Sequence, residues 1–166
     1  SHDDDFVVQL YTQDGLPSDA DDFARFGIMI RNSSDPKAKH FSNYLRRTGD
    51  RVSVQYRDGY GSSTTHATTV HITGGGGRWL QIVKSGDLFR AFYRTETETS
   101  FTLFSEAVVE MDGDLDIGVG LSSFKFNEEI SVAYSDFSVV SVRIRSLLAL
   151  CSCSQAHSYY LTFSFL

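Results

Sequence analysis

The chain has no excess of basic residues, and this absence excludes two kinds of partner. Lys and Arg together number 15 against 21 Asp and Glu, which gives a formal net charge of -6 at pH 7. Nucleic acids and anionic membranes both attract proteins through a concentrated basic face. We therefore expect neither of them to be the main partner. The acidic balance favours solubility and leaves room for cation binding.

Cysteine is also scarce, and the two cysteines present are poorly placed to bond each other. Cys151 and Cys153 form one Cys-x-Cys near the end of the chain. A bond between them would close a very tight and strained ring, so free thiols or pairing with another chain are favoured. Only His157 lies close by in the sequence, and three such residues are too few ligands for a metal site.

Long apolar runs and catalytic motifs are missing too. The final stretch, residues 141–166, is apolar and serine-rich, but Ser152, Ser154 and His157 interrupt it where a membrane-spanning helix needs continuous apolar residues. No Gly-x-Ser-x-Gly elbow occurs, and the histidines have no convincing nucleophile partner. We therefore predict no membrane span and no enzyme activity.

What the sequence does contain is alternation of apolar and polar residues, with turn residues between the alternating segments. In FARFGIMIR, residues 23–31, the even-numbered positions share one face and the odd-numbered positions the other. Hairpins are expected at Thr48-Gly49-Asp50 and at Gly86-Asp87. No long helical pattern appears, so we predict one all-β domain, an antiparallel sandwich of about eight or nine strands.

Two further segments leave a choice of structure. Residues 58–77 are rich in Gly, Ser and Thr, which indicates either a long loop or a poorly packed edge strand. Trp79, the single tryptophan, lies in an apolar strand pattern. We expect it in the core rather than in a ligand platform.

Five segments, in this order, carry a family resemblance: FGIMIRNSSDPKAKHF, VSVQYR, WLQIVKSGDLFRAFYR, IGVGLSS and SDFSV. They resemble the DUF1349-type domains of the concanavalin A-like lectin/glucanase superfamily, over residues 4–140. The resemblance implies a jelly-roll β-sandwich of a kind often attached to secreted glycoside hydrolases and adhesion proteins. Enzymes of that superfamily tend to have an acidic Glu-x-Asp-x-Glu strand, and this sequence has none. The likeness therefore implies binding rather than catalysis.

The resemblance also suggests a role for the end of the chain. Members of the family usually carry another strand or two before the equivalent of FVVQLYT, residues 6–12, so an edge of the sandwich is expected to be incomplete. We predict a sandwich domain at 1–140 and a C-terminal extension at 141–166 whose YYLTFSFL forms one more strand. That strand would fill the vacant edge or pair with a neighbouring subunit, and the second case gives self-assembly.

Polar residues around the first turn are candidates for a ligand site. Planar guanidinium and amide groups suit the vicinal hydroxyls of sugars, and tyrosine rings stack on sugar faces. The simpler alternative is that Arg31 pairs with Asp35 to pin the turn while the neighbouring groups are only solvated. The predicted ligand-binding residues are Arg31, His40, Tyr44, Gln55, Arg57 and Tyr60.

Two shorter patterns indicate a metal site and a modification site. MDGDLD sets Asp112, Asp114 and Asp116 at alternate positions, which offers hard oxygen ligands to a possible calcium ion, although no distal bidentate Glu completes a recognised loop. No other cofactor is expected. Asn32 begins the sequon Asn32-Ser33-Ser34, which weakly favours a secreted glycoprotein.

These observations predict a secreted, non-catalytic module that binds carbohydrate or acts in adhesion, outside the cell or at its surface. Its expected partners are polysaccharides or glycoprotein glycans. The alternative, from another class, is a structural subunit of an extracellular filament, sheath or appendage that assembles by strand addition through residues 141–166.

Overall fold

The computed structural model describes residues 5–46, 50–73, 76–124, 130–142 and 159–162 of the chain. The cysteines Cys151 and Cys153, together with His157, lie outside the described residues. The structure therefore bears on none of the predictions made for the thiols.

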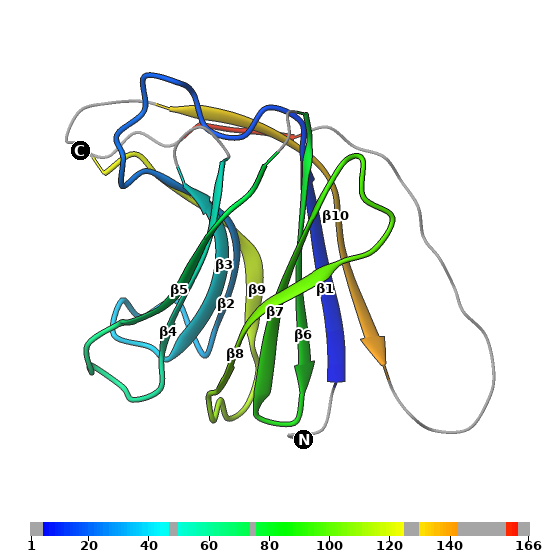
Figure 1. Cartoon of the computed structure of the whole chain (residues 1–166). Coiled ribbons are helices and arrows are strands. Elements are labelled where there is room, and N and C mark those ends of the chain that lie inside the picture. The colour runs from blue at the N-terminus through cyan, green and yellow to red at the C-terminus, as the bar shows by residue number, and fades with distance from the viewer. Residues whose placement is uncertain (1–4, 47–49, 74–75, 125–129, 143–158, 163–166) are drawn as a thin grey trace.

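Two antiparallel sheets pack face to face (Figure 1), which confirms the predicted all-β sandwich. The six-stranded sheet has the order β11-β10-β1-β6-β7-β8, formed by Tyr159–Thr162, Ser131–Val142, Asp5–Thr12, Arg78–Ser85, Leu88–Thr95 and Thr102–Val108. The five-stranded sheet has the order β5-β4-β3-β2-β9, formed by Thr65–His71, Arg51–Arg57, His40–Arg46, Arg25–Arg31 and Asp116–Ser122. Across the described ranges there is no helix, and so none that has the length and apolar character to cross a membrane.

The predicted alternation sets which side chains face the core. In β2, Phe26, Ile28 and Ile30 are fully buried between the sheets, and Arg25 and Arg31 face outward and are partly exposed. Aromatic rings fill the space between the sheets, as in the stacked pair Phe41 and Phe89, whose centroids are 5.2 Å apart. Burial of such side chains is the main source of stability in a sandwich. The complete core cluster is Phe6, Val8, Leu10, Leu16, Ala20, Ala24, Phe26, Ile28, Ile30, Phe41, Leu45, Val52, Val54, Ile72, Leu80, Ile82, Phe89, Ala91, Val109, Met111, Ile130 and Val132.

One polar side chain lies in this apolar interior. Asn43 in β3 has no exposed surface, and its amide nitrogen donates to the backbone carbonyls of Gln81 at 3.0 Å and Phe92 at 2.9 Å. Both acceptors belong to the opposite sheet, and Phe92 lies at a register shift between β7 and β8. Asn43 therefore joins the two sheets by hydrogen bonds, because a buried amide is costly unless its donors find partners.

Trp79 corrects one expectation. It alternates with buried Arg78 and Leu80 in β6, so its ring lies on the outer face of the six-stranded sheet and is only partly buried. It packs against Tyr11 with ring centroids 5.1 Å apart. The expectation of a core position was wrong because an apolar residue beside a buried neighbour in a strand points to the opposite face.

The last described strand and part of the glycine-rich segment occupy sheet edges. β11 pairs with Ser131–Tyr134 of β10, and β10 pairs with β1, so β1 is flanked on both sides. β10 also continues to Val142, past the expected boundary at residue 140, and the division into a domain and an extension stays a prediction. Of the two alternatives for residues 58–77, the part at Thr65–His71 is the edge strand β5.

Candidate functional site

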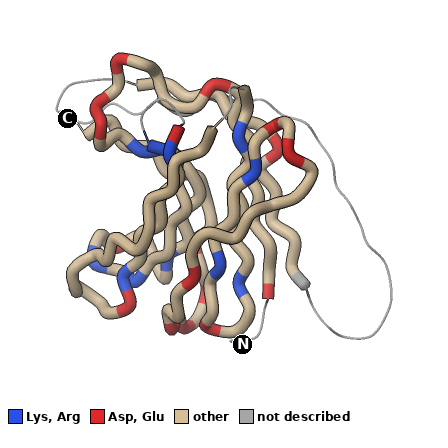
Figure 2. Tube along the Cα trace, in the orientation of Figure 1, with Lys and Arg blue, Asp and Glu red and all other residues tan. Residues whose placement is uncertain are grey.

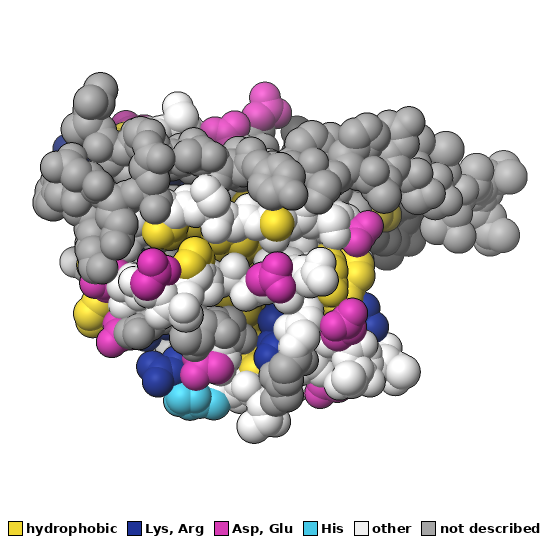
Figure 3. All heavy atoms as spheres, turned by 90° about the horizontal axis from the view of Figure 1, so that it is seen from above, with side chains coloured by type: hydrophobic (Ala, Val, Ile, Leu, Met, Phe, Trp, Pro, Cys, Tyr) yellow, Lys and Arg dark blue, Asp and Glu magenta, His cyan; other side chains and the backbone are white. Residues whose placement is uncertain are grey.

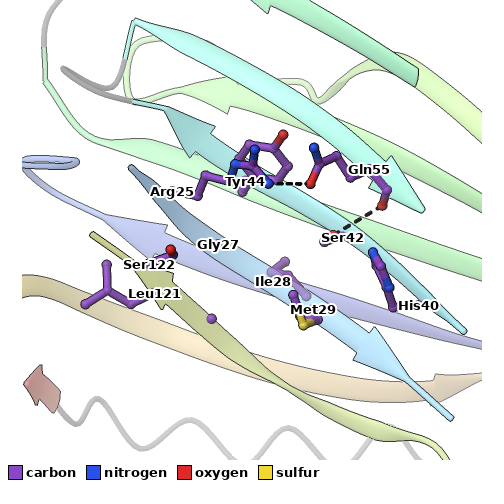
Figure 4. Close-up of a pocket in the computed structure, with 11 residues that line it drawn as sticks. Arg25, Gly27, Ile28, Met29, His40, Ser42, Tyr44, Gln55, Leu121 and Ser122 are labelled. Carbon is purple, nitrogen blue, oxygen red and sulfur yellow. Dashed lines mark hydrogen bonds between the residues drawn. The ribbon is translucent and has the colours of Figure 1, made fainter. Parts of the chain in front are cut away.

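The candidate site is a hollow on the outer face of the five-stranded sheet (Figure 4). Its volume is about 260 Å³. Strands β2, β3, β4 and β9 supply its floor, and segments at both ends of these strands rise around the face in Figure 1. The lining residues are Arg25, Gly27, Ile28, Met29, His40, Ser42, Tyr44, Gln55, Gly120, Leu121 and Ser122.

Glycines on two neighbouring strands shape the hollow. Gly27 in β2 is paired with Tyr44 on one side and with Gly120 on the other. A Cβ at Gly27 would lie 2.3 Å from the carbonyl oxygen of Asn43 and 2.5 Å from the Cα of Tyr44, so only glycine fits there. A Cβ at Gly120 would lie no closer than 3.8 Å to Met29. Gly27 thus lets β2 approach β3 closely at Tyr44, and the missing side chain at Gly120 leaves the hollow open.

Tyr44 forms the aromatic part of the floor and is covered by an arginine. Its side chain is 4% exposed, and the guanidinium carbon of Arg25 lies 5.1 Å from its ring centroid. Arg25 also donates from Nη1 to Oε1 of Gln55 at 2.5 Å, as drawn in Figure 4. His66 stacks beside the tyrosine ring with an angle of 10° between the planes. The floor therefore combines a flat ring with fixed donors and acceptors.

At the opposite end of the strands, His40 lies between two arginines. Arg31 and Arg57 are its register partners on the two neighbouring strands. Burial, together with the charges of Arg57 and Arg31, lowers the pKa of His40 to about 4, while a backbone hydrogen bond with Ala38 acts in the other direction. His40 is therefore neutral at pH 7, and the positive charge at this end belongs to the two guanidinium groups.

The first turn is pinned, but not by the ion pair considered above. Arg31 donates to the backbone carbonyl of Asp35, rather than to its carboxylate. The Asp35 carboxylate accepts from the Lys37 backbone N–H at 2.8 Å and from the Tyr60 hydroxyl at 2.7 Å. Arg57 donates to the carbonyl of Pro36 at 2.7 Å. The carboxylate is thus hydrogen-bonded locally and forms no ion pair with either arginine, although the charge of Arg31, after these two hydrogen bonds, is among the causes that lower its pKa.

The structure brings the predicted ligand-binding residues to one face of the molecule. His40, Tyr44 and Gln55 line the hollow itself, and Arg31 and Arg57 flank His40. Tyr60 is 67% exposed and lies in the loop after β4, tied to Asp35. Whether these residues bind a ligand stays a prediction.

An aromatic rim that the sequence reading missed closes the Arg25 end of the hollow. Phe23 and Phe124 are 52% and 56% exposed, and their ring centroids are 5.5 Å apart. The guanidinium carbon of Arg46 lies 5.3 Å from the Phe23 ring centroid, and that of Arg25 lies 5.2 Å from the Phe124 ring centroid. Phe124 has φ 63°, which is unusual for a residue other than glycine. No local pattern joins positions 23 and 124, so only the fold reveals this pair.

The charges of the face are unevenly distributed. Figure 2 shows Lys and Arg at both ends of the five-stranded sheet, although the chain as a whole is acidic. The end of the molecule seen in Figure 3 carries dispersed Asp and Glu side chains together with Lys, Arg, His and hydrophobic ones. The hollow itself has no Asp or Glu among its described lining residues.

The aspartates proposed for calcium do not form a ligand set. In the part of the chain that the structure describes, no group of three or more His, Cys, Asp or Glu side chains is arranged to hold a metal ion. Asp112 and Asp114 precede β9 in a turn where Gly113 has φ 80°, whereas Asp116 begins the strand opposite Arg31. The positions therefore alternate in sequence without sharing a strand face, and the calcium hypothesis gains no support.

The sequon lies on the same end of the sheet as the first turn. The Asn32 side chain is partly exposed, and its amide donates to the carbonyl of Asp112 at 2.6 Å. One N–H of the amide remains outside this bond. Glycosylation at Asn32 stays a prediction.

A second, more open hollow of about 680 Å³ lies where the edge strands β5 and β8 approach each other. Its lining includes Tyr56, His66, Leu103 and Glu106. It has fewer buried polar groups than the hollow beside Tyr44, and it marks the side at which the two sheets end.

Comparison with solved structures supports the fold. A functionally unknown protein from Saccharomyces cerevisiae aligns with a TM-score of 0.64 at 14% identity, over 85% of this chain and 71% of that one. Sheep galectin-11 in complex with glycerol aligns with a TM-score of 0.44 at 11% identity, over 83% of this chain and 90% of that one. Scytalido-glutamic peptidase with a transition state analog inhibitor has a TM-score of 0.41 at 12% identity, over 99% and 93% of the two chains. No protein-family model and no curated protein sequence matches the chain. At these identities the likeness to the yeast protein shows a shared β-sandwich and nothing about activity.

Proposed function

We propose that the protein is a non-catalytic carbohydrate-binding module of the DUF1349 type, and that it holds a glycan on the outer face of the five-stranded sheet. The observation that carries this proposal is the hollow beside Tyr44, where an aromatic ring, Gln55 and Arg25 converge on a surface left open at Gly120. Ring faces bind the apolar faces of sugars, and fixed amide and guanidinium groups bind hydroxyls.

Binding is favoured over catalysis by the chemistry of the lining. Glycoside hydrolysis uses two carboxyl groups on either side of the bond that is cleaved. The described residues of the hollow offer Arg, His, Ser, Tyr and Gln side chains and no carboxylate. The proposed setting is outside the cell or at its surface, in polysaccharide or glycoprotein recognition, and the exposed sequon turn at Asn32 is the feature that favours it.

The direct test is retention on immobilised polysaccharides, with one variant that fills the hollow and a matched variant that does not. Gly120→Val adds a side chain inside the hollow, where a Cβ makes only ordinary contacts. Gly118→Val makes the same change two residues away in β9, in open space outside the lining. We expect the wild type and Gly118→Val to be retained and Gly120→Val to bind roughly ten-fold more weakly or worse. Retention of none of the three folded proteins, or equal retention of all three, would contradict the proposal.

The location is tested separately. When the chain is expressed through a eukaryotic secretory pathway, a mass shift that disappears in Asn32→Gln is expected. An unmodified secreted protein would remove the sequon as support for an extracellular setting.

A further inference from the structure

The outer face of the five-stranded sheet carries four guanidinium groups that form no ion pair with any carboxylate of the described residues. Arg25 and Arg46 lie toward one end of the sheet, and Arg31 and Arg57 toward the other. Along β2 the two ends are six residues apart, which is about 20 Å in an extended strand. All four side chains are partly exposed.

Every acceptor that the structure shows for these four groups is neutral. Arg25 bonds the side-chain amide of Gln55, and Arg46 bonds the backbone carbonyl of Asp22 at 3.1 Å. Arg31 and Arg57 bond the backbone carbonyls of Asp35 and of Pro36 and Ala38, and Arg57 also bonds the Thr64 hydroxyl at 3.1 Å.

No carboxylate within the described residues forms an ion pair with any of these arginines. Their buried Nε atoms also have no hydrogen-bond partner there. Asp116 is the register partner of Arg31, yet it makes no ion pair with it, and the Asp35 carboxylate is held by Tyr60 and Lys37. The lining of the hollow adds no acidic group among the residues described, so these four guanidinium groups have no carboxylate hydrogen-bond partner on this part of the face, and the nearest carboxylate interaction is that of Asp35 with the charge of Arg31.

We propose that the ligand of this face is an anionic glycan, one that carries carboxylate or sulfate groups, which the arginines at the two ends of the sheet engage. This inference rests on the proposed function and narrows it to a substrate class. The planar fork of arginine matches carboxylate and sulfate oxygens with paired hydrogen bonds, and such charge-assisted bonds are stronger than those to hydroxyl groups. The neutral floor between the two basic ends, where Arg25 covers Tyr44, holds the sugar.

A glycan fits this face better than a nucleic acid does. Binding to a phosphate backbone depends on a basic surface that tracks many phosphates, and the protein carries a net charge of -6. The four arginines stand in two pairs on one sheet face, with a neutral floor of Gly27, Met29, Ser42, Tyr44 and Gln55 between the pairs.

The test uses two matched pairs of ligands, in each of which only the charge differs. Dextran sulfate is compared with dextran, and polygalacturonate with its methyl ester, by calorimetry or retention at a series of salt concentrations. The variants are Arg31→Gln combined with Arg57→Gln, and Gln55→Glu, which adds a carboxylate to the face while all four arginines remain. The control is Arg90→Gln, which removes one arginine from the outer face of the other sheet.

We expect the charged member of at least one pair to bind, its neutral partner to bind at least ten-fold more weakly, and the binding to weaken as salt is added. The sulfate and carboxylate arms then identify the acidic group. The double arginine variant and Gln55→Glu are expected to bind roughly ten- to hundred-fold more weakly, and Arg90→Gln to bind like the wild type. Because Arg31 and Arg57 also pin loops, Gln55→Glu keeps the test valid if the double variant does not fold.

Two outcomes separate this inference from the proposed function. If dextran or the methyl ester binds as tightly as its charged partner, and neither variant changes the affinity, the inference is overturned and glycan binding stands. If no polysaccharide binds the folded protein, both are overturned. Tighter binding to a single-stranded oligonucleotide than to any of the polysaccharides would also overturn the inference.

Discussion

The outer faces of the two sheets carry similar residues but differ in how many of their arginines have a carboxylate partner among the described residues. On the six-stranded sheet, Arg90 pairs with Glu106 at 3.4 Å, and Arg94 bonds the carbonyl of Glu98 while its guanidinium lies over Trp79. On the five-stranded sheet, Arg51 pairs with Asp50 at 3.9 Å, whereas Arg25, Arg31, Arg46 and Arg57 bond only neutral acceptors among the described residues. Both outer faces of a sandwich are exposed to solvent. An arginine that already pairs with a carboxylate of the protein has little capacity for an external anion, whereas an arginine that bonds only neutral acceptors can bind one.

The aromatic residues also differ between the faces. Trp79 is packed between Tyr11 and Arg94, and the Tyr11 hydroxyl donates to Glu96 at 3.4 Å. Tyr44 is packed as well, between Arg25 and His66, but it lies beside the open space at Gly120. An aromatic ring indicates a ligand platform only when its neighbours leave a volume that a ligand can occupy.

The largest effect on stability is expected for a substitution at Gly27, where the five-stranded sheet has no room for a side chain. Gly27→Ala places a Cβ 2.3 Å from a backbone oxygen of the neighbouring strand, so the strands must move apart. We expect the free energy of unfolding to fall by about 3 kcal/mol or more, measured by urea denaturation. Gly120→Ala is the control, because its Cβ meets only ordinary contacts, and its stability is expected to stay within about 1 kcal/mol of the wild type. Equal stabilities for the two variants would show that Tyr44 does not depend on close packing against β2.

The second prediction is that the free energy of unfolding depends on pH through His40, which lies on the five-stranded face. The folded pKa of His40, about 4, lies below its unfolded value near 6.5, so the unfolded state binds the proton first. His40 therefore imposes no penalty above about pH 6.5, and it destabilises the fold progressively as the pH falls towards 4, by about 3 kcal/mol in all. In His40→Gln this loss between pH 6.5 and 4 is expected to shrink, as measured by denaturation at several pH values. An unchanged pH profile would mean that His40 titrates normally in the folded protein.

The third prediction concerns a substitution that gives Arg25, on the five-stranded face, a carboxylate partner like the one that Arg90 has on the six-stranded face. Gln55→Glu places a carboxylate at the position where Gln55 accepts from Arg25 at 2.5 Å, which recreates the kind of pairing seen between Arg90 and Glu106. Since the pair is only partly buried, the change in unfolding free energy is expected to stay within about 1 kcal/mol. Stability would thus be nearly constant while affinity for an anionic glycan falls. A large loss of stability would instead show that the site requires a neutral acceptor at this position for folding.

The sequence predicts the fold well because a strand's side-chain period is local. FARFGIMIR alone assigns Phe26 and Ile28 to the core and Arg25 and Arg31 to the surface, as the structure has them. Which strands are neighbours depends on contacts between residues that are far apart in the sequence. Any site formed by side chains of several strands depends on the same long-range contacts. Arg31, His40 and Arg57 meet only because β2, β3 and β4 are adjacent.

Three features were beyond a reading of the sequence. The rim of Phe23 and Phe124 joins residues a hundred positions apart, and the buried Asn43 is explained only by carbonyl groups of the opposite sheet. Trp79 was misassigned because an apolar strand pattern does not tell which sheet face is covered. Local periodicity thus identifies elements and faces, while the site depends on contacts between strands.

The smallest effect is expected on the six-stranded face, where the counter-charge is already present. The side chains of Arg90 and Glu106 are 37% and 57% exposed, so solvent screens their attraction, and ordering the two long side chains offsets part of it. Glu106→Gln is therefore expected to lower the free energy of unfolding by no more than about 0.5 kcal/mol, measured by urea denaturation at low salt and again at high salt, where the difference should vanish. The same substitution frees Arg90 and creates one unpaired guanidinium on this face. If the face then gains affinity for dextran sulfate, an unpaired arginine alone is sufficient for anion binding. If it does not, the hollow and aromatic floor of the five-stranded sheet are required as well, because a single exposed charge holds an anion only weakly in water.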